Sequence, residues 1–170
     1  MTEKFLARHT TASLETLVNG KRGVIALVPV GSTEPHGPHL GLGTDVVISA
    51  AACLRAAELL EKRGTMVGLI APAISYGVTE CATGFAGAVT IPAAVLTQYI
   101  AAVCDGLIHR LQNGAVSRSA VGVYKSCNSA HRYFLSAISH QWPHPGYAAG
   151  PLPGSIFYSR AAPGEPSSRR

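Results

Sequence analysis

Residues 29–45 combine two carboxylates and two imidazoles with many residues that permit tight turns. The stretch reads PVGSTEPHGPHLGLGTD and contains Glu34, His36, His39 and Asp45. It follows VIALV, an apolar run typical of a buried strand. Titratable groups at the end of a buried strand cost free energy unless something pairs with them. We therefore expect a metal ion, a substrate or another of these side chains as the partner.

The spacing of Glu34, His36 and Asp45 permits a shared ligand. Glu34 and His36 are two positions apart, so both leave the same side of an extended segment. The glycines that follow allow tight turns that bring Asp45 back towards them. Carboxylate oxygens together with an imidazole nitrogen suit Zn²⁺, Mn²⁺ or Fe²⁺, and an Asp can bridge two such ions. In the alternative, Asp45 only caps the next helix, His36 hydrogen-bonds a carbonyl and Glu34 is solvated.

The elements that must position these residues alternate between strand and helix. Apolar runs predict strands at residues 22–31, 66–74 and 117–125, and a short extended piece at 88–92. Helical spacing predicts helices at residues 11–20, 44–64 and 92–114, with Thr44 or Asp45 as the N-cap of the second and Gly64 at its end. This order predicts an α/β fold with a mostly parallel sheet, in which ligands gather beyond the carboxyl ends of the strands.

The composition restricts the class of protein. The chain has 170 residues, enough for one domain with a full core, of which 47% are hydrophobic and 14% charged. No apolar stretch reaches the ~20 residues that a bilayer span needs, and the N-terminus lacks the apolar core of a signal peptide. The four cysteines are widely spaced and three lie among apolar residues, which favours buried free thiols. We therefore expect a cytoplasmic protein without a membrane partner.

The net charge of +5 lies in the last third of the chain. Residues 1–114 carry eight Lys or Arg and eight Asp or Glu, whereas residues 115–170 carry six Lys or Arg and one Glu. Because the folded part is neutral, we expect no nucleic-acid partner. Six of the eleven prolines fall from Pro143 onward, without helical or strand periodicity. We expect a first unit at residues 1–114 and, at 115–170, a divergent, basic tail rich in Pro, Gly and Ser and largely disordered.

Two separated motifs resemble one enzyme family. VPVGSTEPHGPHLGLGTD at residues 28–45 and ISYGVTECATGFAGAVTI at residues 74–91 are similar, in this order and spacing, to the creatininase (creatinine amidohydrolase) family. The resemblance runs from about Gly23 to about Gly114. It implies a three-layer α/β/α fold and metal-dependent hydrolysis of C–N bonds in small cyclic amides, formamides or peptide ends. It also implies assembly as a homo-oligomer.

The resemblance assigns roles to individual residues. Glu34, His36 and Asp45 match the family's metal ligands, with Asp45 in the bridging place between two divalent ions (Zn, Mn or Fe). His39 matches the second His of the motif, for which a structural role next to the site is expected. Tyr76 and Glu80 match the segment that borders the substrate pocket, although both fit an ordinary loop equally well. His39 is a further candidate for this pocket.

The resemblance stops after the second long helix. There the family has a strand that ends in Asn-Gly-His, whose His is a further ligand, whereas this chain reads VGVYKSCNSAH at residues 121–131. We therefore expect a domain that is incomplete at its C-terminus, with a shifted reading frame or a truncation near residues 112–118. One hypothesis is an amidohydrolase that cleaves a non-peptide C–N bond of a small, cyclic amide with metal-activated water. The alternative is a non-catalytic truncated or frame-shifted remnant of such an enzyme.

Overall fold

The structure is a computed structural model that describes residues 2–64, 66–111, 120–125, 148–149 and 155–159, with side chains described in the first two ranges. Helices in these ranges are α1 (Thr11–Val18), α2 (Thr44–Arg63) and α3 (Ala93–Leu111), with 3-10 turns η1 (Leu6–Arg8) and η2 (Glu80–Ala82). Strands are β1 (Gly23–Val30), β2 (Met66–Ile70), β3 (Ala120–Lys125), β4 (Ala148–Ala149) and β5 (Ser155–Ser159). The expected break near residues 112–118 lies outside the described residues.

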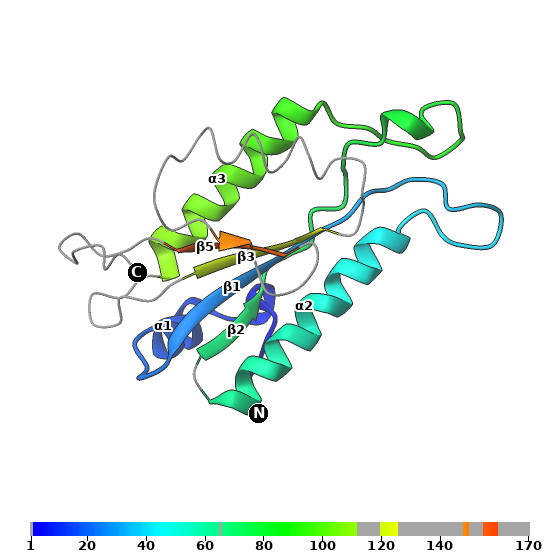
Figure 1. The fold of residues 1–170 in the computed structure, drawn as a ribbon. Coiled ribbons are helices and arrows are strands. Elements are labelled where there is room, and N and C mark those ends of the chain that lie inside the picture. The colour runs from blue at the N-terminus through cyan, green and yellow to red at the C-terminus, as the bar shows by residue number, and fades with distance from the viewer. Residues whose placement is uncertain (1, 65, 112–119, 126–147, 150–154, 160–170) are drawn as a thin grey trace.

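The sheet has the order β2-β1-β3-β5-β4 (Figure 1). Strands β2 and β3 are both parallel to β1, whereas β5 is antiparallel to β3 and β4 is antiparallel to β5. The predicted strands at 22–31, 66–74 and 117–125 are therefore present in shortened form. The extended piece predicted at 88–92 is not a strand. Thr90 forms only an isolated bridge with Gly77, because these residues pair with a neighbouring loop and not with an edge of the sheet.

Strands β3, β4 and β5 fall in the segment 115–170, which was predicted to be a largely disordered tail. They show that part of this segment has strand backbone next to the parallel strands. The remainder lies outside the described residues, so the predicted lack of order there stays a prediction.

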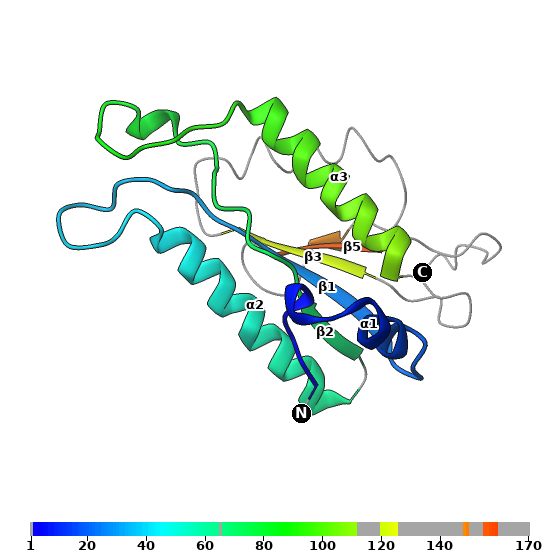
Figure 2. The ribbon, with the colours of Figure 1, turned by 180° about the vertical axis from the view of Figure 1, so that it is seen from behind.

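Helices cover both faces of the sheet, which confirms the predicted three-layer α/β/α fold (Figures 1 and 2). Side chains of β1 alternate between the two faces, as the two-residue period of a strand requires. Val24, Ala26, Val28 and Val30 pack in a cluster with Ile100, Cys104 and Ile108 of α3, and α1 adds Leu14 and Leu17. Ile25 and Leu27 pack with Cys53 and Ala57 of α2. Each large apolar side chain buried in this way stabilises the fold by about 1.5–3 kcal/mol.

Helix α2 ends where the sequence predicts but begins with a different cap. Gly64 has φ 68°, and its N–H donates to the carbonyls of Leu60 and Glu61. The N-cap is Gly43, without a side-chain cap, so the predicted capping by Thr44 or Asp45 is wrong. The Thr44 hydroxyl donates instead to the Gly41 carbonyl at 2.6 Å. The Asp45 side chain does not cap the helix and lies beside His36.

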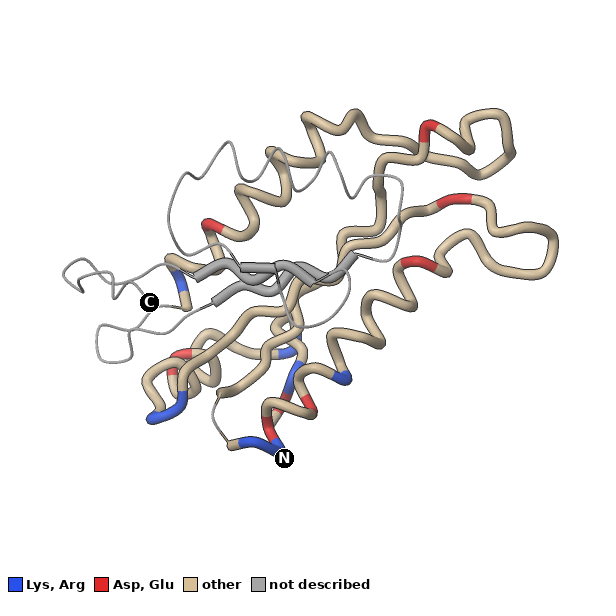
Figure 3. The backbone as a smooth tube through the Cα atoms, viewed as in Figure 1, with Lys and Arg blue, Asp and Glu red and all other residues tan. Residues whose placement is uncertain are grey.

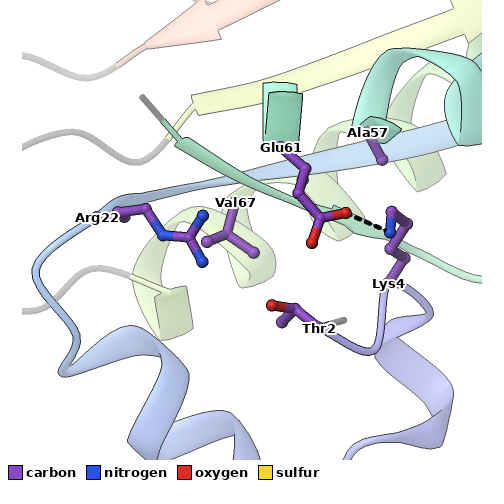
Figure 4. Close-up of a pocket in the computed structure, with 7 residues that line it drawn as sticks. Thr2, Lys4, Arg22, Ala57, Glu61 and Val67 are labelled. Carbon is purple, nitrogen blue, oxygen red and sulfur yellow. Dashed lines mark ion pairs between the residues drawn. The ribbon is translucent and has the colours of Figure 1, made fainter. Parts of the chain in front are cut away.

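The N-terminal segment covers one end of the outer edge of β2 (Figure 2). The Ile70 N–H donates to the Lys4 carbonyl at 2.7 Å, and Phe5 forms a parallel bridge with Ile70. The buried Lys4 ammonium lies 2.6 Å from the Glu61 carboxylate of α2, beside a small cavity lined also by Arg22 (Figure 4). The segment therefore satisfies part of an otherwise unpaired strand edge.

The Lys4–Glu61 pair gives the folded state a pH dependence. The hydrogen bond from Lys4 holds the pKa of Glu61 below its ordinary value. The contribution of the pair is therefore complete above the unfolded-state pKa of Glu61 and is lost as the pH falls through its lower folded-state pKa. We expect Lys4→Met to lower the thermal unfolding midpoint at pH 7 and to change it less at an acidic pH at which Glu61 is protonated.

Thermal melts of wild type and Lys4→Met at both pH values measure this difference. Arg55→Met is the matched control, since Arg55 and Glu58 form an ion pair in which both side chains are exposed. An equal loss for Lys4→Met at the two pH values, or an equal loss for Arg55→Met, would contradict the role of the Lys4–Glu61 pair.

Candidate metal centre

Two loops extend beyond the carboxyl end of β1, and α2 begins directly against that end (Figure 1). A Cβ atom at Gly31 would lie 2.5 Å from the backbone nitrogen and 2.6 Å from the Cα of Val46. Only a glycine therefore permits the first turn of α2 to approach so closely. This contact brings Asp45 over the end of the strand. This role of Gly31 was not predicted, although a glycine directly between a buried strand and a polar cluster was a usable signal.

The structure brings Glu34, His36 and Asp45 together. One ligand atom from each lies within 4.8 Å of the others. Asp45 is buried, whereas Glu34 and His36 are partly exposed. The His36 Nε2 atom lies 3.3 Å from Asp45 Oδ1, and His36 Nδ1 lies 2.9 Å from the Glu34 carbonyl oxygen. The predicted convergence at the carboxyl end of β1 is therefore present.

The contacts of His36 leave its Nε2 atom directed at Asp45. Because a carbonyl oxygen can only accept, Nδ1 carries the proton that is donated to Glu34. In the neutral ring, Nε2 then presents a lone pair to the carboxylate oxygen, and two acceptors repel unless a proton or a cation lies between them. Two ligands on one Zn²⁺ ion in tetrahedral geometry lie roughly 3.4 Å apart, close to the 3.3 Å found here.

Asp45 provides a second reason to expect a cation. Its Oδ2 atom is buried and has no hydrogen-bond partner in the part of the chain that the structure describes. A buried carboxylate oxygen without a donor is costly, and coordination to a metal ion removes that cost. The donor set of two carboxylates and one imidazole suits Zn²⁺, Mn²⁺ or Fe²⁺. The residues present therefore fit a divalent cation, with Asp45 able to offer one oxygen to each of two ions.

The charges near the cluster also favour a cation. The two loops, residues 31–43 and 71–92, contain no Lys or Arg, and Figure 3 shows only acidic charges along them. The Lys and Arg residues of the described helices lie in other parts of the chain, for example at the C-terminal ends of α2 and α3. A site surrounded by negative charge raises the local concentration of divalent cations.

The residues predicted for the substrate pocket lie outside the ligand cluster. His39 and Glu80 are exposed, and Tyr76 is about half exposed. Tyr76 follows Ser75, whose carbonyl accepts from the Thr33 hydroxyl at 2.8 Å. The loop that contains Tyr76 therefore runs beside residues 31–43, which we call the metal loop. No described contact joins these three side chains to the cluster, and their place in a substrate pocket stays a prediction.

The buried cysteines among the described residues, Cys53 and Cys104, are not reactive thiolates. Burial raises the pKa of the Cys53 and Cys104 thiols to about 12, with a smaller contribution from Asp105 at Cys104. Cys81 is exposed, so burial holds for Cys53 and Cys104 but not for it. Cys127 lies outside the described residues.

Among the described helices, none is long and apolar enough to cross a membrane.

The fold and the cluster define an α/β/α protein with a candidate divalent-metal centre beyond the carboxyl end of β1. The sequence profile of the family described as "Creatininase: Creatinine amidohydrolase" matches residues 7–113. The chain therefore belongs to the creatininase family.

Curated relatives and solved structures agree with this assignment. The mycofactocin precursor peptide peptidase of Mycolicibacterium smegmatis is 43% identical over 91 residues, which cover 54% of this chain and 35% of that protein. The protein of the same name from Mycobacterium tuberculosis is 37% identical over 78 residues, or 44% of this chain and 31% of that protein. A mutant creatininase complexed with creatine has a TM-score of 0.65 at 22% identity, covering 82% of this chain and 51% of that one. A structure described as creatininase Mn has a TM-score of 0.65 at 23% identity, with the same coverage.

These matches cover only part of each relative. The solved structures show the fold, and the chain spans about a third of the first peptidase relative and about half of the solved creatininases.

The close approach at Gly31 predicts a large cost for a single methyl group. Gly31→Ala would force the first turn of α2 away from β1, and we expect a loss of roughly 1–3 kcal/mol in the free energy of unfolding. Gly41→Ala is the control, because a Cβ atom there meets nothing within 4 Å. Denaturant titration measures both variants. Equal stability of Gly31→Ala and wild type would show that α2 does not rest on Gly31.

Proposed function

We propose that this chain forms the metal-binding part of a hydrolase that cleaves a C–N bond of an amide. The observation that carries the proposal is the buried Asp45 carboxylate, which faces His36 with one oxygen and has no described donor on the other. When bound there, divalent ions lower the pKa of a water molecule and polarise an amide carbonyl. Membership of the creatininase family and the hydrolase names of its relatives support this class.

The chain's own residues would prepare the site in distinct ways. Asp45 holds two oxygens at fixed positions because its helix rests on Gly31. His36 keeps Nε2 free to coordinate because Nδ1 is committed to the Glu34 carbonyl. Glu34 offers its side-chain carboxylate from the same short segment. We assign all three as metal ligands, with Asp45 as the bridge between two ions.

The substrate is either a small amide or a peptide, and one observation favours the peptide. The peptidase relatives are 37–43% identical over their matched residues, whereas the solved creatininases are 22–23% identical. Peptide side chains would also find apolar partners in the two loops, where Leu40, Phe85 and Val89 are exposed. We therefore place a peptide ahead of the small, cyclic amide that the motifs alone suggested.

Three ligands are few for two ions. A structural or catalytic ion commonly needs three or four protein ligands, so Glu34, His36 and Asp45 leave a pair of sites under-filled. Full activity therefore requires further ligands, from elsewhere in the complete domain or from another copy in a homo-oligomer. Without them the chain is the non-catalytic remnant, which holds one ion weakly.

We also propose that the protein is cytoplasmic. The free thiols of all three described cysteines support this location.

Removal of the Asp45 charge tests the metal site. We expect Asp45→Asn to weaken Mn²⁺ and Zn²⁺ binding by more than roughly tenfold in calorimetric titration, because the amide offers one neutral oxygen in place of two charged ones. Asp105→Asn on α3 is the control, since Asp105 is not one of the converging ligands. If Asp45→Asn binds metal like wild type, the proposed centre is wrong.

A further inference from the structure

Leu42 connects the metal loop to the loop between β2 and α3. Its carbonyl accepts the Glu34 N–H at 3.0 Å, so the backbone of a proposed ligand depends on where Leu42 lies. Its side chain lies against Gly87, where a Cβ atom would be 2.5 Å from Leu42 Cδ1 and 3.2 Å from Cδ2. Gly87 also has φ 86°, a conformation that other residues rarely adopt.

The position of Gly87 is itself fixed relative to the metal loop. The Val89 N–H donates to the Thr33 carbonyl at 3.2 Å, and the Thr33 hydroxyl donates to the Ser75 carbonyl at 2.8 Å. Thr33 directly precedes Glu34. Both ends of the second loop are therefore tied to the residue next to a proposed ligand, and Gly87 lies between them as a surface for Leu42.

We propose that Leu42 and Gly87 are positioning residues for Glu34. Contact with Gly87 fixes Leu42, and the Leu42 carbonyl then fixes the backbone from which the Glu34 carboxylate extends. Leu42 is 39% exposed, so the contact buries little apolar surface and acts mainly by restricting where Leu42 can lie. A metal ligand must be held to within about 0.5 Å, so a shift of this loop would lower metal affinity. The importance for metal rests on the proposed function, whereas the effect on the Glu34 backbone does not.

Hydrogen exchange of the Glu34 amide in the metal-free protein, followed by NMR, tests the proposal directly. In Gly87→Ala the new methyl group displaces Leu42, and we expect the Glu34 amide to exchange about tenfold faster than in wild type. Gly84→Ala is the matched control in the same loop, because a Cβ atom there meets nothing within 4 Å and its φ is not positive. The Ile70 amide, which donates to Lys4 far along the chain, should exchange at the wild-type rate in both variants.

A double-variant cycle separates the contact from backbone strain at Gly87. Leu42→Ala removes the side chain that the methyl group would meet, so Gly87→Ala should add little to the exchange rate of Leu42→Ala. Unchanged exchange at Glu34 in Gly87→Ala would overturn the proposal. Additive effects of the two substitutions would also overturn it, since Gly87 would then act without Leu42. If Gly87→Ala does not fold, Leu42→Ala alone decides, with faster exchange at Glu34 expected.

Metal titration of the same variants distinguishes this inference from the proposed function. We expect Gly87→Ala to bind Zn²⁺ about tenfold more weakly than wild type and Gly84→Ala to bind it equally well. The wild-type protein could bind neither Zn²⁺ nor Mn²⁺ while the Glu34 amide still exchanges faster in Gly87→Ala than in wild type. That result would uphold the positioning role and refute the metal centre.

Discussion

A carboxylate buried at the end of a buried strand must be balanced by a cation, a proton or several donors. Asp45 is such a buried carboxylate, because α2 rests directly on Gly31 and its first turn therefore lies over the end of β1. One Asp45 oxygen faces His36, and the other has no hydrogen-bond partner among the described residues. A divalent cation bound there would satisfy both oxygens at once.

The stable part of the fold and the part that carries the candidate site differ in construction. Strand β1 is buried along its whole length between the clusters packed on α2 and α3. The loops are held by single backbone hydrogen bonds and by close contacts at glycines, such as those from Glu34 to Leu42 and from Val89 to Thr33. A site of this kind gains its precision from many small constraints, and each can be altered without loss of the core.

Local pattern predicted the frame of the fold well. The helix at 44–63, its end at Gly64 and the strand of β1 follow from apolar spacing and a left-handed glycine, which act within a few residues. The convergence of Glu34, His36 and Asp45 was predicted from their spacing together with the family resemblance. The N-cap of α2 was wrong, because Gly43 leads into the helix while Thr44 hydrogen-bonds Gly41. The extended piece at 88–92 does not join the sheet, since Thr90 forms its bridge with Gly77 of a loop.

Contacts between distant segments could not be predicted in this way. The approach of Leu42 to Gly87 and of Gly31 to Val46 depends on how the loops cross, which periodicity does not encode. The same limit applies to Cys81, whose neighbours in sequence do not reveal that it is exposed. A glycine beside a polar motif signals a close approach but does not name the residue that approaches.

Coordination of a divalent ion by Glu34, His36 and Asp45 can be measured at the ion itself. X-ray absorption at the zinc edge of the Zn²⁺-loaded chain reports the atoms bound to the ion. We expect a shell of oxygen and nitrogen atoms at about 2.0–2.2 Å with the outer scattering of imidazole, which is lost in His36→Ala. A sulfur atom at about 2.3 Å, or an unchanged imidazole signal in His36→Ala, would contradict it.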